Sequence, residues 1–108
     1  MTSTLAELTE KVCMVSDSYA RECGIERDDD WYLLKLQEEL GELGAEHLRN
    51  TGRGRRDGEH AGNAREKLEN ETADVFAQLL LFAEHNAIDL EASLARKWFR
   101  YLDAHSTP

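Results

Sequence analysis

The sequence predicts an all-α protein, a four-helix bundle that we expect to associate into oligomers. Its 108 residues include one proline, Pro108 at the very end, so no proline interrupts an internal helix. Four stretches repeat apolar residues at the spacing of an amphipathic helix, and no stretch has the alternation of a strand. Four helices with mostly short connections are typical of a bundle. The length fits a single domain over residues 1–108.

The first two helices have recognisable end signals. Thr4 and Glu7 have the spacing of a capping box, and we expect the helix that begins there to end near residue 22, before Gly24. The three aspartates at residues 28–30 can cap the second helix and suit the positive end of its dipole. We expect this second helix to continue to about Arg49.

A glycine-rich segment follows at residues 50–62. It contains four glycines together with Arg53, Arg55 and Arg56, and we expect a flexible loop. These arginines either close over a phosphorylated ligand, as mobile lids do, or are solvated, which is the commoner case. The third helix is expected from Asn63, where Glu66 completes a second capping box, to about residue 86.

The fourth helix is expected from Asp89, a suitable N-cap, to Asp103. Trp98 has the spacing of a core stripe with Leu94 and Leu102, so we expect these three side chains to be buried. The third helix has more apolar surface than a monomer of this length easily buries. This excess favours a two-fold homodimer or a homotetramer.

The net charge is −9, which argues against binding to duplex nucleic acid or to an anionic membrane surface. No apolar run reaches transmembrane length, and we expect no signal peptide. Cys13 and Cys23 fall on one helix, about 15 Å apart along its axis, which is farther than a disulfide spans. We therefore expect free thiols and a cytoplasmic protein.

Two acidic clusters, Glu38-Glu39-x-x-Glu42 and Glu71-x-x-Asp74, lie within the second and third expected helices. Residues three or four apart share one helix face, so each cluster projects its carboxylates in one direction. Convergent carboxylates repel one another and stay together only when a cation neutralises them. Mg²⁺ prefers such oxygen ligands, so the pattern predicts a divalent metal site that holds the phosphates of a substrate.

An ordinary surface is the alternative for the cluster on the second helix. Glu39 borders the apolar face of this helix, and Lys35 is placed one turn earlier to pair with it. Exposed glutamates are common on helices, so a solvated acidic flank explains this cluster equally well. Glu38 and Glu46 are the easiest to explain as surface residues.

The cluster on the third helix is harder to explain without a cation. Residues 73–83 are apolar almost all round the helix, which predicts burial on most sides, and Asp74 lies among them. A buried carboxylate without a partner costs several kcal/mol, whereas an exposed helix ion pair contributes only about 0.3–0.5 kcal/mol. A metal ion or a buried Arg or Lys is therefore expected beside Asp74.

Four segments taken together carry the pattern of a known family. They read LQEELGEL at residues 36–43, ETADVFAQL at 71–79, IDLEA at 88–92 and KWFR at 97–100. Over about residues 30–102 the chain resembles the MazG-like all-α nucleoside triphosphate pyrophosphohydrolases. Two features depart from the family pattern, because the connection between the acidic clusters is long and Tyr101 stands where members often have Asn.

The resemblance implies hydrolysis of a nucleoside triphosphate substrate to the monophosphate and pyrophosphate, an activity that clears unwanted nucleotides. The family forms dimers and tetramers. The implied cofactor is Mg²⁺, with Mn²⁺ as a substitute, and its implied ligands are Glu39, Glu42, Glu71 and Asp74. Glu38 is implied as the carboxylate that orients or deprotonates the attacking water.

Further cations are expected at the phosphates. The resemblance points to Lys97 and Arg100, although both can instead form a solvated basic face, and Lys35 can serve either role. Trp31, at the start of the second helix, is a candidate for stacking on a nucleobase, although aromatic residues at helical spacing are more often part of the core. Two alternative functions are phosphoribosyl-ATP pyrophosphohydrolysis and a non-catalytic helical interaction module.

Overall fold

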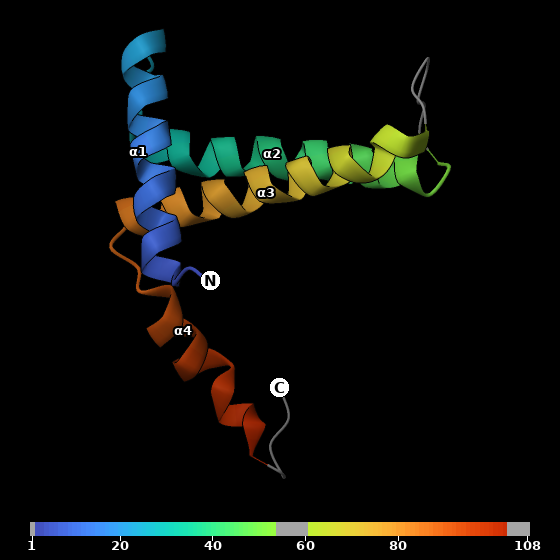
Figure 1. Cartoon of the computed structure of the whole chain (residues 1–108). Helices are drawn as coiled ribbons and strands as arrows, with labels where there is room; N and C mark the ends of the chain where they lie inside the picture. The colour runs from blue at the N-terminus through green and yellow to red at the C-terminus, as the bar shows by residue number, and fades with distance from the viewer. Residues whose placement is uncertain (1, 54–60, 104–108) are drawn as a thin grey trace.

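The computed structural model describes residues 2–53 and 61–103. Within these ranges the chain forms helices and no strand (Figure 1), which confirms the expected all-α class. The elements are α1 (Leu5–Cys23), α2 (Asp29–Asn50), α3 (Ala61–His85), α4 (Leu90–Lys97) and the 3-10 helix η1 (Phe99–Leu102). None of the described helices is long and apolar enough to cross a membrane.

Side-chain caps determine where three of the helices begin. The Thr4 hydroxyl accepts a hydrogen bond from the backbone N–H of Glu7 at 3.1 Å, and the Glu7 carboxylate accepts one from the Thr4 backbone at 3.3 Å, as the capping box predicts. Gly24 ends α1 with φ of 63°, a conformation that glycine adopts at little cost. Asp28 and Asp89 cap α2 and α4 through hydrogen bonds of 2.8 Å and 3.0 Å.

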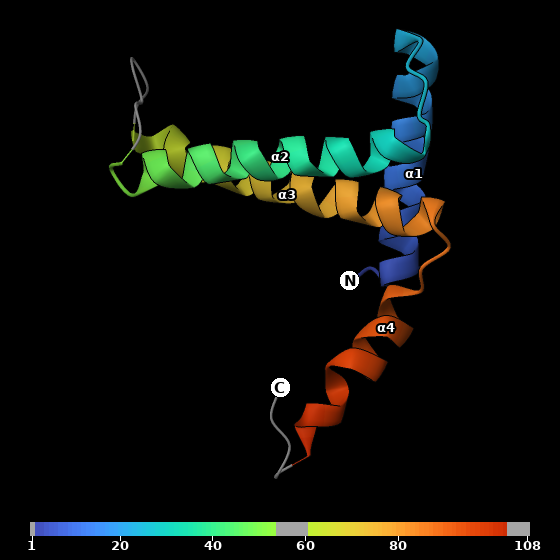
Figure 2. The ribbon, with the colours of Figure 1, turned by 180° about the vertical axis from the view of Figure 1, so that it is seen from behind.

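α2 and α3 form an antiparallel pair. They lie side by side, and α1 crosses them near the start of α2 and the end of α3 (Figures 1 and 2). His85 ties this end together, because its Nε2 lies 2.7 Å from the Asp29 carboxylate and its ring stacks on Tyr32 at 4.1 Å. The buried apolar side chains come from α1 and α3, and they are Ala20, Leu80, Leu81 and Ala83.

A single chain does not close into the expected four-helix bundle. α4 and η1, together the arm, contact each other and point away from the α2–α3 pair (Figure 1). The radius of gyration is 17.1 Å, against roughly 13 Å for a compact chain of this length. Trp98 is 57% exposed, and Leu94 and Leu102 are exposed as well. The prediction that these three side chains form core is therefore wrong for one chain, because the arm turns away from the other described helices.

Two helix ends differ from the sequence expectation. α3 already begins at Ala61, so Asn63 lies inside the helix and is not its N-cap. α4 ends at Lys97, and the chain continues as a 3-10 helix after Trp98, so the continuous helix expected to Asp103 is interrupted. A short helix without tertiary packing has little to extend it, because most helical stability in proteins comes from a packed face.

Two other expectations concern the cysteines and the arginines of the glycine-rich segment. Cys13 and Cys23 are both free thiols, as expected from their separation. Arg53 is exposed in the turn that follows α2. Arg55 and Arg56, the remaining arginines of the expected loop, lie outside the described residues.

Leu80 lies in the core and is only 1% exposed, which predicts the effect of shortening its side chain. Leu80→Ala is expected to lower the free energy of unfolding by about 2–5 kcal/mol, because it removes buried methyl groups and leaves a cavity. Leu34→Ala removes the same atoms at a side chain that is 60% exposed and is expected to change stability by less than about 0.5 kcal/mol. Urea unfolding followed by circular dichroism measures both, and equal losses would contradict this core.

Candidate metal centre

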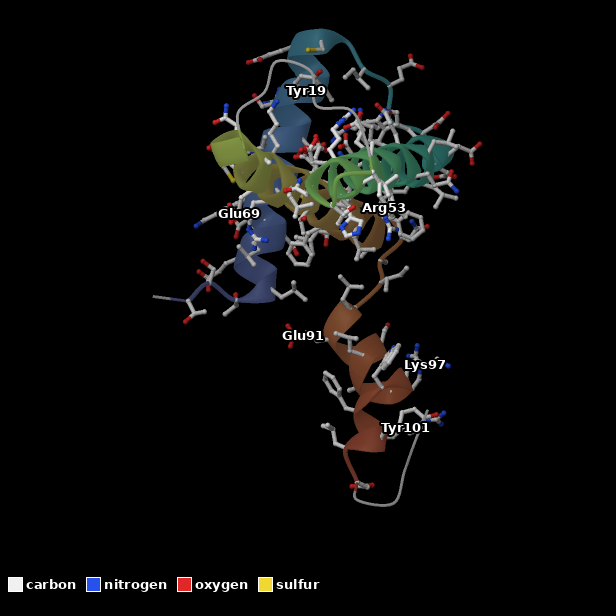
Figure 3. The ribbon with its side chains drawn as sticks, turned by 90° about the vertical axis from the view of Figure 1, so that its right-hand side faces the viewer. Tyr19, Arg53, Glu69, Glu91, Lys97 and Tyr101 are labelled. Carbon is white, nitrogen blue, oxygen red and sulfur yellow. The ribbon has the colours of Figure 1, made fainter. Side chains whose placement is uncertain are left out.

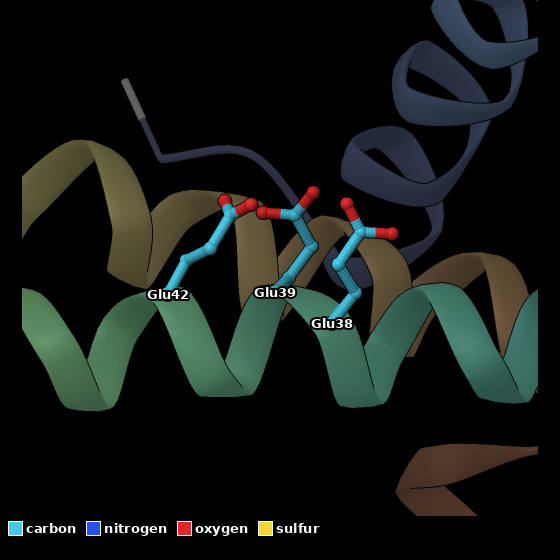
Figure 4. A group of neighbouring side chains, drawn as sticks. All are labelled: Glu38, Glu39 and Glu42. Carbon is cyan, nitrogen blue, oxygen red and sulfur yellow. The ribbon is translucent and has the colours of Figure 1, made fainter.

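The two acidic clusters meet between α2 and α3. Glu39, Glu71 and Asp74 each offer one carboxylate oxygen, and these oxygens lie within 4.8 Å of one another. A second group with the same spacing forms within α2 from Glu38, Glu39 and Glu42. Figure 4 shows their three carboxylates on the same side of α2, with those of Glu39 and Glu42 facing each other. Glu39 belongs to both groups and is the centre of the cluster.

Burial without hydrogen-bond partners distinguishes this cluster from an acidic surface. Glu39 is only 9% exposed. The Oε2 atoms of Glu39 and Glu71 are buried without a hydrogen-bond partner among the described residues, and the same is true of Oε1 of Gln78. Buried polar atoms in proteins are otherwise hydrogen-bonded in the large majority of cases. Buried carboxylate oxygens without hydrogen-bond partners in an acidic cluster are typical of a cation-binding site.

The same surroundings oppose ionisation of two carboxyls. Burial raises the pKa of the Glu39 carboxyl above its ordinary value, and repulsion from Glu42 and Asp74 raises it further, whereas Lys35 lowers it. Burial also raises the pKa of the Glu71 carboxyl, again with repulsion from Glu42 and Asp74. A nearby divalent cation acts in the opposite direction, because it favours the charged carboxylates.

Lys35 forms the ion pair that the sequence predicts. Its Nζ lies 3.7 Å from Oε1 of Glu39 and 3.4 Å from the Glu38 carboxylate. Burial lowers the pKa of Lys35, but Glu38, Glu39 and Glu42 together raise it by more. The ammonium group is therefore charged at neutral pH. One such group does not balance the five carboxylates of the two clusters.

Asp74 does not have the burial expected from its apolar neighbours in the sequence. It is exposed, because α3 is covered by α2 and α1 and is open on another side. Phe76 and Leu79 on the same helix are 45% and 37% exposed. The strongest case for a cation therefore comes from Glu39 and Glu71, which are the residues with unpartnered buried oxygens.

Glu46 is also placed differently from expectation. It was expected at the surface, yet it is 5% exposed, with its carboxylate 3.0 Å from Nη1 of Arg49. Its spacing contained a usable signal, because Glu46 follows Glu42 by four residues and Glu39 by seven, which places it on the same helix face. Glu38, by contrast, is exposed as expected.

A largely apolar pocket opens beside the cluster. It has a volume of about 360 Å³ and is lined by residues of α1, α2 and α3, a size that accepts a small organic ligand. Trp31 and Tyr19 line it, together with Lys35 and Gln78. Because Lys35 also contacts Glu39, the pocket and the acidic cluster are adjacent. The structure thus brings the stacking candidate Trp31 into the same pocket as Lys35, the residue that contacts Glu39.

Lys97 and Arg100 are not brought to the cluster. Both are on the arm, and Figure 3 shows Lys97 and Tyr101 well away from α2 and α3. Nη2 of Arg100 donates a hydrogen bond of 2.6 Å to the Tyr101 hydroxyl, and the guanidinium lies 4.8 Å from the centre of that ring. Within one chain these two residues do not reach a phosphate held at the acidic cluster.

The ligand set fits a hard divalent cation. The two groups of potential ligands consist of carboxylates alone, with no Cys or His among the described members. Oxygen-only sets suit Mg²⁺ and Mn²⁺, whereas zinc sites usually include nitrogen or sulfur ligands. The residues present therefore fit the Mg²⁺ expected from the sequence.

Comparisons of the chain with models of protein families, with curated proteins and with solved structures find no match. The MazG-like resemblance is therefore supported by the sequence motifs alone. The chemistry of the centre is inferred from its carboxylates and their surroundings.

We expect Mg²⁺ to stabilise the folded protein. A ligand that binds only the native state raises the free energy of unfolding by about 2.7 kcal/mol when its free concentration is 100 times its Kd. Differential scanning calorimetry with EDTA and with Mg²⁺ measures the shift. Glu39→Gln removes the carboxylate shared by both groups and is expected to abolish it. Glu69→Gln, at an exposed residue of α3 (Figure 3), is expected to retain it, and equal shifts in the two variants would contradict the site.

The raised pKa values of Glu39 and Glu71 predict a pH dependence in the absence of metal. Because both pKa values are higher in the folded state than their ordinary value of 4.5, folding takes up protons and stability falls as pH rises from about 4.5 through the folded pKa. In EDTA, we expect the combined Glu39→Gln and Glu71→Gln substitutions to make this decline shallower. Chemical unfolding between pH 4 and pH 8 measures the free energy of unfolding of both proteins. The same pH dependence in the variant and the native protein would contradict raised pKa values of these two carboxyls in the folded state.

Proposed function

We propose that the protein is a Mg²⁺-dependent nucleoside triphosphate pyrophosphohydrolase of the MazG-like type. It cleaves between the α- and β-phosphates and releases a nucleoside monophosphate and pyrophosphate, clearing unwanted nucleotides in the cytoplasm. The observation that carries the proposal is the group of carboxylates contributed by α2 and α3, in which Glu39 and Glu71 each have a buried oxygen without a partner.

The carboxylates divide into ligands and a proton acceptor. Glu39, Glu42, Glu71 and Asp74 hold the metal, and each has an oxygen in one of the two close groups. Mg²⁺, when bound, neutralises charge on phosphate oxygens and lowers the pKa of coordinated water. Glu38 is exposed at the edge of the cluster, so it is accessible to a water molecule that it orients or deprotonates.

The pocket beside the cluster supports a nucleotide as the substrate. Phosphates bound at the metal leave the rest of the molecule to extend into the pocket, where Trp31 of α2 and Tyr19 of α1 offer aromatic surface for a nucleobase. Lys35 lies between the two regions, since it contacts Glu39 and also lines the pocket. Its ammonium group is therefore placed to contact a phosphate oxygen.

The position of the arm limits which other residues belong to the site. The resemblance assigns phosphate contacts to Lys97 and Arg100, but their place on the arm gives that role no support within one chain. We include a homodimer or homotetramer in the proposal, because large apolar side chains such as Phe76 and Leu102 are exposed and extended apolar surface usually marks an interface.

A nucleotide panel tests the reaction. The protein is incubated with ribo- and deoxynucleoside triphosphates, phosphoribosyl-ATP and Mg²⁺, and the products are separated by ion-exchange chromatography. Monophosphate with pyrophosphate is the expected pair, and diphosphate with phosphate would contradict the proposed bond cleavage. Preferential turnover of phosphoribosyl-ATP would select that alternative. Absence of both turnover and Mg²⁺-dependent stabilisation would select the non-catalytic helical module.

The division of roles makes a separate prediction for Glu38. Glu38→Gln is expected to lower kcat by about 10²–10⁴-fold, the usual contribution of a general base, while the thermal shift with Mg²⁺ is retained. Glu69→Gln, the exposed control on α3, is expected to leave kcat unchanged. Steady-state kinetics and calorimetry on the same preparations measure both quantities. Loss of the Mg²⁺ shift in Glu38→Gln would show that this residue is a ligand and not a proton acceptor.

A further inference from the structure

A second depression lies away from the acidic centre, between α1, the end of α3 and the first turn of α4. This α1–α3 groove has a volume of about 620 Å³. Part of its lining is apolar, with Leu80 buried and with Met14 and Ile88 exposed at 65% and 41%. It also has several carboxylates and no basic residue among the described side chains that line it, the acids being Glu10, Asp17, Glu84, Asp89 and Glu91.

Two of these carboxylates are already engaged within the chain. Asp17 pairs with Arg27 at 2.8 Å, and Asp89 caps α4. Glu10, Glu84 and Glu91 are exposed at the groove. The groove therefore offers an apolar floor with uncompensated negative charge, and its natural occupant is an apolar segment flanked by cations.

The arm of this protein has that composition. Residues 94–102 contain Arg96, Lys97 and Arg100 and no acidic residue, although the whole chain has a net charge of −9. The same nine positions include large apolar side chains that are exposed by 43% to 80%, namely Leu94, Trp98, Phe99 and Leu102. The arm is thus complementary to the α1–α3 groove in both charge and polarity.

The arm does not fill the groove of its own chain. Leu90 and Glu91, in the first turn of α4, line the groove, and the rest of the arm continues away from α1 and α3 (Figures 1 and 2). We propose that the α1–α3 groove binds the arm of a second copy of the chain, and that two copies exchange arms about a two-fold axis. Each copy then covers the apolar residues that the other leaves exposed.

Disulfide trapping between two single-cysteine proteins tests this exchange. In a Cys13→Ser, Cys23→Ser background, one protein carries Met14→Cys in the groove and the other carries Trp98→Cys on the arm, with a longer tag on one so that mixed dimers migrate separately. We expect mild oxidation to yield the mixed dimer at least 10-fold faster than when Leu34→Cys, on α2 and outside the groove lining, replaces Met14→Cys. The native residues at positions 14, 34 and 98 are 65%, 60% and 57% exposed, so collision alone favours neither pair.

Two outcomes would overturn the proposal. One is a mixed dimer that forms no faster than in the Leu34→Cys control. The other is a Met14→Cys, Trp98→Cys double variant that cross-links within one chain and has the mass of a 12.3 kDa monomer by light scattering, which would place the arm in its own groove. The test needs no nucleotide and no metal, so its result is independent of the proposed hydrolase activity.

Discussion

The burial of carboxylates that α2 and α3 bring together, with the repulsion between them, opposes the ionisation of Glu39 and Glu71 and so the packing of this helix pair. Among the acidic side chains between the helices, Glu39 and Glu46 are buried and Glu71 is half-buried, and Glu39 and Glu71 each have an oxygen without a hydrogen-bond partner in the described part of the chain. Burial of a charge is costly unless it is paired. In the proposed function a divalent cation supplies that pairing, and the helix pair then becomes a site for phosphates.

The apolar core lies at one end of the helix pair, so the rest of the pair depends more strongly on the proposed cation. The buried apolar residues lie where α1 crosses the helix pair, and Leu80 and Leu81 of α3 are among them. Beyond that crossing, no third helix of residues 2–53 and 61–103 packs on the pair (Figure 1). Under the proposed function, metal binding stabilises the fold directly, because a site formed only in the native state adds its binding free energy to folding. The carboxylates are close together before an ion binds, and holding them so is unfavourable without the ion, as expected of a preformed binding site.

Local structure could be predicted from the sequence, but the packing of whole helices could not. The caps at Thr4, Asp28 and Asp89 and the left-handed Gly24 follow from the chemistry of one or two residues, and they are present. The position of the arm depends on what packs against it. The periodicity of apolar residues in the sequence indicates that a helix has an apolar face to bury, but not which helix covers that face. Trp98 was accordingly expected in the core of the chain that carries it.

At the candidate site, too, local spacing could be predicted from the sequence, whereas burial could not. The i,i+3 and i,i+4 spacings on α2 and α3 identified the carboxylates that converge, because both helices are regular. Burial depended on which neighbouring helix covers which face, so Asp74 proved exposed and Glu46 proved buried. Gln78 illustrates a further limit, since an unpartnered amide oxygen is visible only once the surrounding helices are in place.

We propose that one divalent cation site joins α2 to α3 through Glu39, Glu42, Glu71 and Asp74. A crystal grown with Mn²⁺ tests it directly, because anomalous scattering locates the ion without reference to activity. We expect an anomalous peak within coordination distance of the Glu39 and Glu71 carboxylates. Well-ordered Glu39 and Glu71 side chains with no anomalous peak between them, at a Mn²⁺ concentration that saturates any thermal shift, would contradict it.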